Sequence, residues 1–212
     1  MIRLRRKYAG RRTDIWPRVW RRRPIAMVIM FALVGLVVWD RLRAPAGSDH
    51  DRYHNKTFTC VNVVDGDTID IDIADRKYET TRIRLWGVDT PETAKSPKGL
   101  MYYGNEASAS TKSLVSGQPV RVVLAPARTR GKYGRLLAYV YLQDGETMLN
   151  EELITRGCAY ADHRFEHPWR VRFLGLEDKA QKAKVGLWRN VTPEQMPEWR
   201  QRYDQWRASH AD

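Results

Sequence analysis

The middle of the chain alternates between hydrophobic and polar positions, and this alternation predicts strands. Ile69, Ile71 and Ile73 alternate with Asp70 and Asp72. Because successive side chains of a strand point to opposite faces, the pattern is typical of a strand with one buried face. Similar patterns, rich in β-branched and aromatic residues, predict four more strands at residues 57–64, 78–86, 120–124 and 136–142.

Helical patterns interrupt and follow these strands. Residues 105–115 are rich in alanine and lysine, and we expect Asn105 to cap this helix. Two further helices are predicted at residues 148–155, ending at Gly157, and at residues 173–185, ending at Gly186. Five strands with about three helices indicate an α+β, mainly β, fold. A small five-stranded β-barrel of the oligonucleotide/oligosaccharide-binding (OB) type is the architecture that fits best.

The C-terminal segment, residues 189–212, carries a third kind of pattern. Trp199, Tyr203 and Trp206 follow one another at helical spacing. Such an aromatic stripe more often packs on the domain than binds a ligand. We therefore predict a helical tail with its aromatic face against the domain.

The N-terminal region contains an apolar segment at residues 25–39, which holds no charged residue. Fifteen residues at a rise of about 1.5 Å cover roughly 22 Å of a roughly 30 Å hydrocarbon layer, which is short for a membrane span. Trp39 can lie at the interface, and flanking arginines can reach the headgroups. We predict a basic cytoplasmic arm at residues 1–24, a transmembrane helix at residues 25–39 and a linker at residues 40–56.

The predicted membrane segment has two alternative fates. It remains as a single-pass signal anchor, or it is cleaved as a signal peptide near Ala46, within the small-residue sequence Ala44-Pro45-Ala46. The long basic arm favours the anchor and places the N-terminus in the cytoplasm. Both alternatives put residues 44–212 outside the cytoplasm. A buried core helix would not be preceded by so many arginines.

Charge is distributed unevenly along the chain. The formal net charge is +12, of which residues 1–43 carry +10 and residues 44–212 only +2. The basic excess therefore belongs to the N-terminal arm, which is also suited to anionic lipid headgroups. A nucleic-acid site in the remainder must come from the local placement of charge.

The chain has two cysteines, Cys60 and Cys158, which is too few for a zinc pattern or a disulfide framework. One bridge is possible in an oxidising compartment. Two small buried thiols are the simpler interpretation, because free cysteine is often buried.

Three short segments combine carboxylates with arginines: Asp-Gly-Asp-Thr at 65–68, Arg-x4-Asp-Thr-Pro-Glu at 84–92 and Lys-Tyr-Gly-Arg at 132–135. Carboxylates without a Cys/His cluster suit calcium or magnesium. A glutamate near the metal can orient or deprotonate water, and arginines can hold a phosphate and stabilise its transition state. Each motif alone also fits an ordinary turn or a solvent-facing strand residue.

The order of these motifs resembles the thermonuclease family, the staphylococcal-nuclease-like domains, over residues 57–188. Leu149-Asn150-Glu151 and Gly186-Leu187-Trp188 are also similar to segments of that family. The resemblance implies a five-stranded barrel with three helices. It also implies a calcium-dependent nuclease that cleaves DNA and RNA with little sequence preference and leaves 3′-phosphate ends.

The resemblance further implies a role for each matched residue. Calcium would be bound by the side chains of Asp67 and Asp89 and by the backbone carbonyl of Thr90, with Asp65 supporting them. Residues implied in catalysis are Glu92, which acts on the attacking water, and Arg84 and Arg135, which hold the phosphate. Residues implied in contacts to the nucleotide are Lys132 and Tyr133.

One position departs from the family pattern. Where the family often has tyrosines that pack on a base, this chain has His163 and Phe165. Phe165 can still stack on a base. His163 and His167 are spaced by four, but Pro168 adjoins them and no further soft ligand is near, which disfavours a metal role.

Two function classes remain. The first is a membrane-anchored or exported nuclease, acting as a monomer on DNA and RNA with Ca²⁺ as cofactor. The second is a catalytically silent module that binds nucleic acid or protein on the same barrel. Degenerate domains of the second class usually lack carboxylates or arginines of the site, and none of the expected set is missing here.

Overall fold

The computed structural model describes residues 27–34 and 48–210, and the chain divides into two units, residues 1–45 and 46–212. Residues 27–34 are helical. The predicted basic arm, the rest of the apolar segment 25–39 and the cleavage site near Ala46 lie outside the described residues. Among the residues that are described, no helix has both the length and the apolar character needed to cross a membrane.

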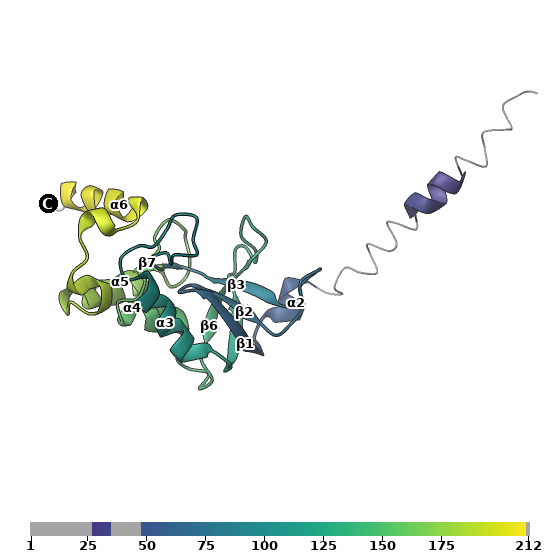
Figure 1. Cartoon of the computed structure of the whole chain (residues 1–212), viewed down its shortest axis with the longest axis horizontal. Coiled ribbons are helices and arrows are strands. Elements are labelled where there is room, and N and C mark those ends of the chain that lie inside the picture. Colours follow the sequence, from purple (N-terminus) through teal and green to yellow (C-terminus); the bar gives the residue numbers. More distant parts are fainter. Residues whose placement is uncertain (1–26, 35–47, 211–212) are drawn as a thin grey trace, which may run out of the picture. The chain divides into compact units, whose positions relative to one another are not determined.

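The second unit is built on a closed five-stranded barrel, as predicted (Figure 1). Its strands are β1 (Lys56–Asp65), β2 (Thr68–Ile71), β3 (Thr81–Leu85), β5 (Pro119–Leu124) and β6 (Leu136–Tyr141). They pair in the order β1-β2-β3-β6-β5, and β1 and β5 close the barrel. β3 and β6 run parallel, whereas the other pairs are antiparallel. Residues that fill the barrel core include Ile69, Ile71, Ile83, Leu85, Leu136 and Val140.

The strands differ from the predicted ones at several ends. β2 stops at Ile71 and β3 starts at Thr81, because Asp75 and Tyr78 pair with each other across a turn. In β1 the simple alternation is wrong. The pairing with β2 shifts register on both sides of residues 62–63, so Cys60 and Val63 are both buried while Val61 is exposed. Such a bulge moves the inward-facing set by one residue.

A short two-stranded sheet was not predicted. β4 (Val88–Asp89) pairs with β7 (Tyr160–Ala161), so that Asp89 lies opposite Tyr160. Strands of two residues are too short for a periodic pattern to reveal. This pairing nevertheless brings the region after residue 160 next to a predicted metal ligand.

The three predicted helices are present, with shifted ends. They are α3 (Gly104–Val115), α4 (Leu149–Thr155) and α5 (Arg170–Lys182), which gather on one side of the barrel (Figure 1). The predicted Asn105 cap is wrong, because α3 begins at Gly104 after Tyr103 in a left-handed conformation, with no side-chain cap. Gly157 follows α4 with φ +64°, as expected of a C-terminal glycine. Gly186 does not end α5 but begins the 3₁₀-helix η2 (Gly186–Arg189).

Three further helical elements occur between residues 48 and 210. α2 (Asp49–Tyr53) lies in the predicted linker, where a capping box between Ser48 and Asp51 starts it. η3 (Pro193–Gln195) and α6 (Glu198–Ser209) form the predicted C-terminal helical segment. The aromatic stripe of α6 packs as expected at Trp199 and Tyr203, but Trp206 is exposed.

Candidate active site

Asp67, Arg84 and Asp89 meet at one edge of the barrel. Asp67 precedes β2, whose first residue, Thr68, pairs with Arg84 of β3. The Arg84 guanidinium forms an ion pair with Asp67 and donates through Nη2 to Oδ1 of Asp89 at 2.5 Å. The two predicted calcium ligands therefore lie on either side of one arginine.

Thr90 connects these carboxylates through the main chain. Its backbone N–H and its hydroxyl donate to Oδ2 of Asp67 at 3.0 and 3.2 Å. Thr90 is buried, so both hydrogen bonds are shielded from water. The prediction that its carbonyl binds a cation remains a prediction.

The donor set at this edge is made of oxygen atoms. Calcium and magnesium prefer such ligands and take six or more of them, often including water and substrate phosphates. Asp67, Asp89 and the Thr90 carbonyl fit part of such a set. Within residues 27–34 and 48–210, no cluster of three or more acidic, histidine or cysteine side chains is placed to hold a metal ion.

Asp65 lies near these carboxylates, at the end of β1. Oδ1 of Asp65 accepts the backbone N–H of Gly66 at 2.8 Å. Burial raises the pKa of Asp65, and the nearby charges of Glu92 and Asp89 act in the same direction. The hydroxyl of Thr111 in α3 donates to the Gly66 carbonyl at 2.6 Å and fixes this turn.

Glu92 is held by the start of α3. Its carbonyl accepts the N–H of Met101 at 2.9 Å, and Gly104 lies so close to it that any side chain there would overlap. Burial alone would raise the pKa of Glu92, but hydrogen bonds from Ser96 and Lys98 outweigh it and lower that pKa. Glu92 is therefore a carboxylate at neutral pH and can accept a proton.

Arg135 directly precedes β6 and lies near Arg84, because β3 and β6 are parallel neighbours. Burial, with the charges of Arg84 and Arg82, lowers the pKa of Arg135. Arg135 takes part in no ion pair in the described part of the chain, whereas Arg84 holds two carboxylates. The two predicted phosphate ligands are thus neighbours with different partners.

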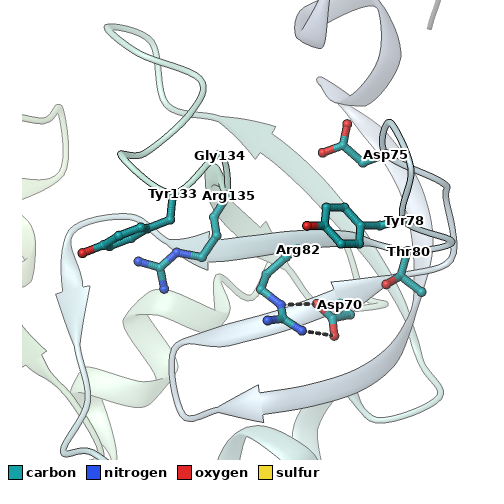
Figure 2. A pocket seen from close by; sticks show the side chains of 8 residues that line it. All are labelled: Asp70, Asp75, Tyr78, Thr80, Arg82, Tyr133, Gly134 and Arg135. Atoms are coloured by element: carbon teal, nitrogen blue, oxygen red, sulfur yellow. Dashed lines mark hydrogen bonds and ion pairs between the residues drawn. The ribbon is translucent and has the colours of Figure 1, made fainter. Parts of the chain in front are cut away.

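A hollow of about 290 Å³ opens next to Arg135, between the β2–β3 face and the loop before β6. Tyr78 and Tyr133 lie on opposite sides of it, with Arg82 and Arg135 between them (Figure 2). The Arg82 guanidinium donates twice to Asp70, at 2.8 and 3.1 Å. Sequence reasoning did not indicate this hollow.

The loop that carries Lys132 and Tyr133 is fixed by Arg130. Its guanidinium bridges Asp49 of α2, at 2.7 Å, and Asp75, at 2.6 Å, and it also donates to the Gly134 carbonyl. Lys132 and Tyr133 themselves are exposed, with the Lys132 ammonium 5.7 Å from the Tyr133 ring centre. Their predicted contact with a nucleotide is therefore not blocked by other side chains.

Phe165 packs against Trp86, which follows β3. Its side chain is 39% exposed, and its ring centre is 4.8 Å from that of Trp86. Trp86 is tied to the barrel by Asn150, which accepts from the Val140 N–H and donates to the Trp86 carbonyl. Phe165 remains a predicted stacking residue.

Two side chains that sequence reasoning missed also reach Asp89. Trp199 of α6 donates its indole N–H to Oδ2 of Asp89 at 2.7 Å, and Arg164 donates to the same oxygen at 3.2 Å. Arg164 is in turn paired with the buried Asp162 at 2.7 Å. No sequence signal links Trp199 to Asp89, because 110 positions separate them.

His163 and His167 pack against different aromatic side chains. His163 stacks on Tyr203 with ring centres 3.7 Å apart, and His167 packs against Phe173 at 5.2 Å. Burial lowers the pKa of both rings. Within the described residues, neither ring belongs to a group of three or more potential metal ligands.

The two cysteines are free and buried, which confirms the simpler interpretation. Burial raises the pKa of Cys60 to about 11 and also raises that of Cys158. Both thiols are therefore protonated and unreactive at neutral pH.

Comparison with known proteins places this site in context. The family model described as "Staphylococcal nuclease homologue" matches residues 82–190. The thermonuclease of Staphylococcus hyicus is 38% identical over 138 residues, which are 65% of this chain and 78% of that protein. The thermonuclease of Staphylococcus intermedius is also 38% identical, over 63% of this chain and 76% of the relative. Endonuclease YncB of Bacillus subtilis is 34% identical over 71% of each chain.

Proposed function

Because this chain belongs to the staphylococcal nuclease homologue family and is a nuclease, we propose that it cleaves DNA and RNA with calcium as cofactor. Cleavage has little sequence preference and leaves 3′-phosphate ends. The observation that carries this proposal is the pair Asp67 and Asp89 around Arg84, with Arg135 as its neighbour. Carboxylates for a hard cation and arginines for a phosphate then occupy one edge of the barrel.

The proposed roles follow from the surroundings of each residue. Asp67, Asp89 and the Thr90 carbonyl hold the cation, with Asp65 behind them. Bound calcium supplies positive charge that offsets the charge of the phosphate. Glu92, ionised at neutral pH, takes a proton from the attacking water.

Arg135 and Arg84 have complementary tasks in this proposal. Arg135, without an ion pair in the described residues, donates to a phosphate oxygen and stabilises the extra charge of the transition state. Arg84 holds the carboxylates in place through both Nη groups and donates a remaining N–H to the phosphate. Lys132, Tyr133 and Phe165 contact the nucleotide on either side.

The test is cleavage of single-stranded DNA by the full-length protein, with calcium and then with a chelator. Glu92→Gln should lose several orders of magnitude in rate and keep the wild-type melting temperature. Glu146→Gln, a change at an exposed turn, is the matched control and should cleave normally. Full calcium-dependent activity in Glu92→Gln would contradict the proposed role of Glu92 in taking a proton from water.

The alternative, a silent binding module, makes a different prediction for the same assay. It binds the DNA with or without calcium and cuts it in neither condition. The presence of both carboxylates, both arginines and Glu92 argues for the enzyme. A binding module needs no glutamate that activates water.

We propose further that the nuclease domain lies outside the cytoplasm, anchored through residues 25–39. The support is the uncharged segment itself and the +10 charge of residues 1–43. A reporter fused to the C-terminus should be active only in the periplasm or outside the cell. Release of the domain in soluble form, with a new N-terminus near Ala46, would favour the cleaved signal peptide instead.

A further inference from the structure

The carboxylate of Asp89 is held from two directions. Oδ1 accepts from Arg84 at 2.5 Å on the side of Asp67, whereas Oδ2 accepts the Trp199 indole N–H at 2.7 Å and a longer hydrogen bond from Arg164 at 3.2 Å. A carboxylate engaged in this way cannot rotate freely. Its orientation therefore depends on α6, which begins beyond residue 190, where the family match ends.

α6 is fastened to the domain directly beside Trp199. Arg200 is 1% exposed and pairs with Glu177 of α5, which is 0% exposed, at 2.5 Å. The other carboxylate oxygen of Glu177 accepts the N–H of Ala161 at 3.0 Å. Ala161 pairs with Val88, the residue before Asp89. A continuous chain of buried contacts thus connects α6 to the strand that carries Asp89.

The Trp199 ring is oriented by its neighbours. It meets the Tyr160 ring edge to face at 6.1 Å, and the Arg164 guanidinium lies 4.4 Å from its centre. An edge-to-face aromatic contact and a guanidinium over the ring restrict the direction of the indole N–H. The contact with Asp89 is therefore built into the packing of α6.

We propose that Trp199 is a positioning residue for the calcium ligand Asp89, which it holds so that Oδ1 stays turned toward Asp67. An indole N–H suits this task because it donates one hydrogen bond and carries no charge that would repel a cation. Partners of this kind typically change metal affinity by about 10- to 100-fold when removed. The inference rests on the proposed calcium site.

The test compares the full-length wild type with Trp199→Phe, which keeps an aromatic ring and loses the donor. Calorimetric titration should show calcium affinity weakened by about 10-fold or more. Trp206→Phe is the matched control on the same helix, because Trp206 is 56% exposed and does not touch Asp89. Its calcium affinity should equal that of the wild type.

A spectroscopic measurement distinguishes positioning from a general loosening of α6. In ¹⁵N-labelled wild type, the indole resonance that is missing from Trp199→Phe should shift when calcium is added, and the indole resonance of Trp206 should not. Unchanged or tighter calcium binding by Trp199→Phe overturns this inference alone. Failure of the wild type to bind calcium overturns the proposed calcium site as well.

A second inference comes from the hollow beside Arg135. Its two acidic side chains are both ion-paired: Asp70 pairs with Arg82, and Asp75 pairs with Arg130, which it shares with Asp49. Arg135 adds a guanidinium that forms no ion pair with the described residues, and the Lys77 ammonium lies 5.4 Å from the centre of the Tyr78 ring at the opposite end. The hollow thus combines the Arg135 guanidinium with two exposed tyrosines, Tyr78 at 61% and Tyr133 at 76%.

We infer that this hollow binds the nucleotide next to the cleaved phosphate of a single strand, with its base on Tyr78. Its volume of about 290 Å³ is just below the range for small-molecule sites, roughly 300–1,000 Å³, which suits one nucleotide. Positive grooves with stacking aromatics are typical of single-strand binding. Because Arg135 lines the hollow and is a proposed phosphate ligand, the inference rests on the proposed function (Figure 2).

Binding of a fluorescent oligothymidylate, followed by anisotropy in the Glu92→Gln background, tests this site. Tyr78→Ala should weaken binding by about fivefold or more, as expected for the loss of one stacked base. Trp206→Ala removes an exposed aromatic far along the sequence, on α6, and should bind like the parent. Unchanged binding by Tyr78→Ala overturns this inference, whereas a parent that binds no oligothymidylate at all contradicts the nucleic-acid substrate.

Discussion

The barrel edge and the C-terminal region contribute to the candidate site in different ways. Asp67, Arg84 and Arg135 lie on or next to three strands that pair with one another. Trp199 and Arg164, in contrast, reach Asp89 through helix packing and the short β4–β7 pairing. Side chains on adjacent strands are placed by backbone hydrogen bonds, whereas those of the C-terminal region depend on buried side-chain contacts.

The two regions have different roles in the proposed site. Residues on the barrel edge carry the groups that bind a cation and a phosphate, and each belongs to a short motif. Residues of the C-terminal region hold one of those groups from behind. We therefore expect changes at the barrel edge to alter the rate with little effect on folding, and changes at α6 to alter stability and cation affinity first.

The largest expected effect is on the barrel edge. Arg135→Met should lower kcat/KM by about 10³-fold, the size expected when a donor to a developing charge is lost. Its melting temperature should stay near that of the wild type, because Arg135 makes no ion pair in the described residues. Cleavage rates and thermal melts of this variant check both statements. Arg202→Met, at an exposed position of α6, is the control and should cleave normally.

In the C-terminal region, we expect an equally large effect on the free energy of unfolding. Arg200→Met leaves Glu177 buried without its partner, which should lower the free energy of unfolding by about 3–5 kcal/mol. Burial already raises the pKa of Glu177 despite Arg200. Urea unfolding of the purified protein measures the loss.

A double variant sharpens this prediction. Arg200→Met with Glu177→Gln removes the unpaired charge and should recover much of the lost stability. A loss below about 1 kcal/mol in Arg200→Met would contradict the role of the buried Arg200–Glu177 pair in fastening α6, since that is the range of an exposed pair.

The barrel and the residues of its edge were predictable because their signals are local. Alternation gave the five strands, and the motifs around Asp67, Arg84 and Arg135 fall at strand ends and turns. The bulge in β1 was not predictable. Cys60 and Val63 are both buried because the pairing with β2 shifts register between them. A residue's phase along a strand changes at a bulge without any change in composition.

The supports of the site were not predictable for a different reason. Trp199 was assigned only to packing, because nothing near it in the sequence points to a carboxylate 110 positions away. Arg130 and Asp49 meet across 81 positions, and Asp49 lay in a predicted linker. Such contacts depend on the tertiary fold, which a periodic pattern does not report.

A smaller effect is expected where α3 meets Glu92. Gly104→Ala places a Cβ where it would overlap the Glu92 carbonyl, so the helix or Glu92 must move. Overpacking of this kind costs about 1–3 kcal/mol, and the displaced Glu92 should also slow cleavage. Thermal melts and cleavage rates of the same preparation report both changes.

Gly175→Ala is the matched control for this change. Gly175 lies within α5, and an added Cβ there meets nothing within 4 Å. It should raise stability by about 0.5–1 kcal/mol through helix propensity and leave cleavage unchanged. A Gly104→Ala variant that behaves like Gly175→Ala would show that Glu92 is not held by the start of α3.

The smallest effect is expected at α2, which supports the Lys132–Arg135 loop in the way that α6 supports Asp89. Burial alone would raise the pKa of Asp49, but hydrogen bonds from Arg130 and Thr129 outweigh it and lower that pKa below 3.8. Because the folded-state pKa is lowered, the stabilisation is present above the unfolded value and is lost as pH falls below about 4. Asp49→Asn should therefore be less stable than the wild type near neutral pH, and the difference should shrink in acid.

Urea unfolding at several pH values measures this difference. Asp178→Asn is the control, because its carboxylate meets Arg207 only at 3.4 Å. A difference that persists unchanged at low pH would mean that Asp49 supports the loop through its packing and not through its charge.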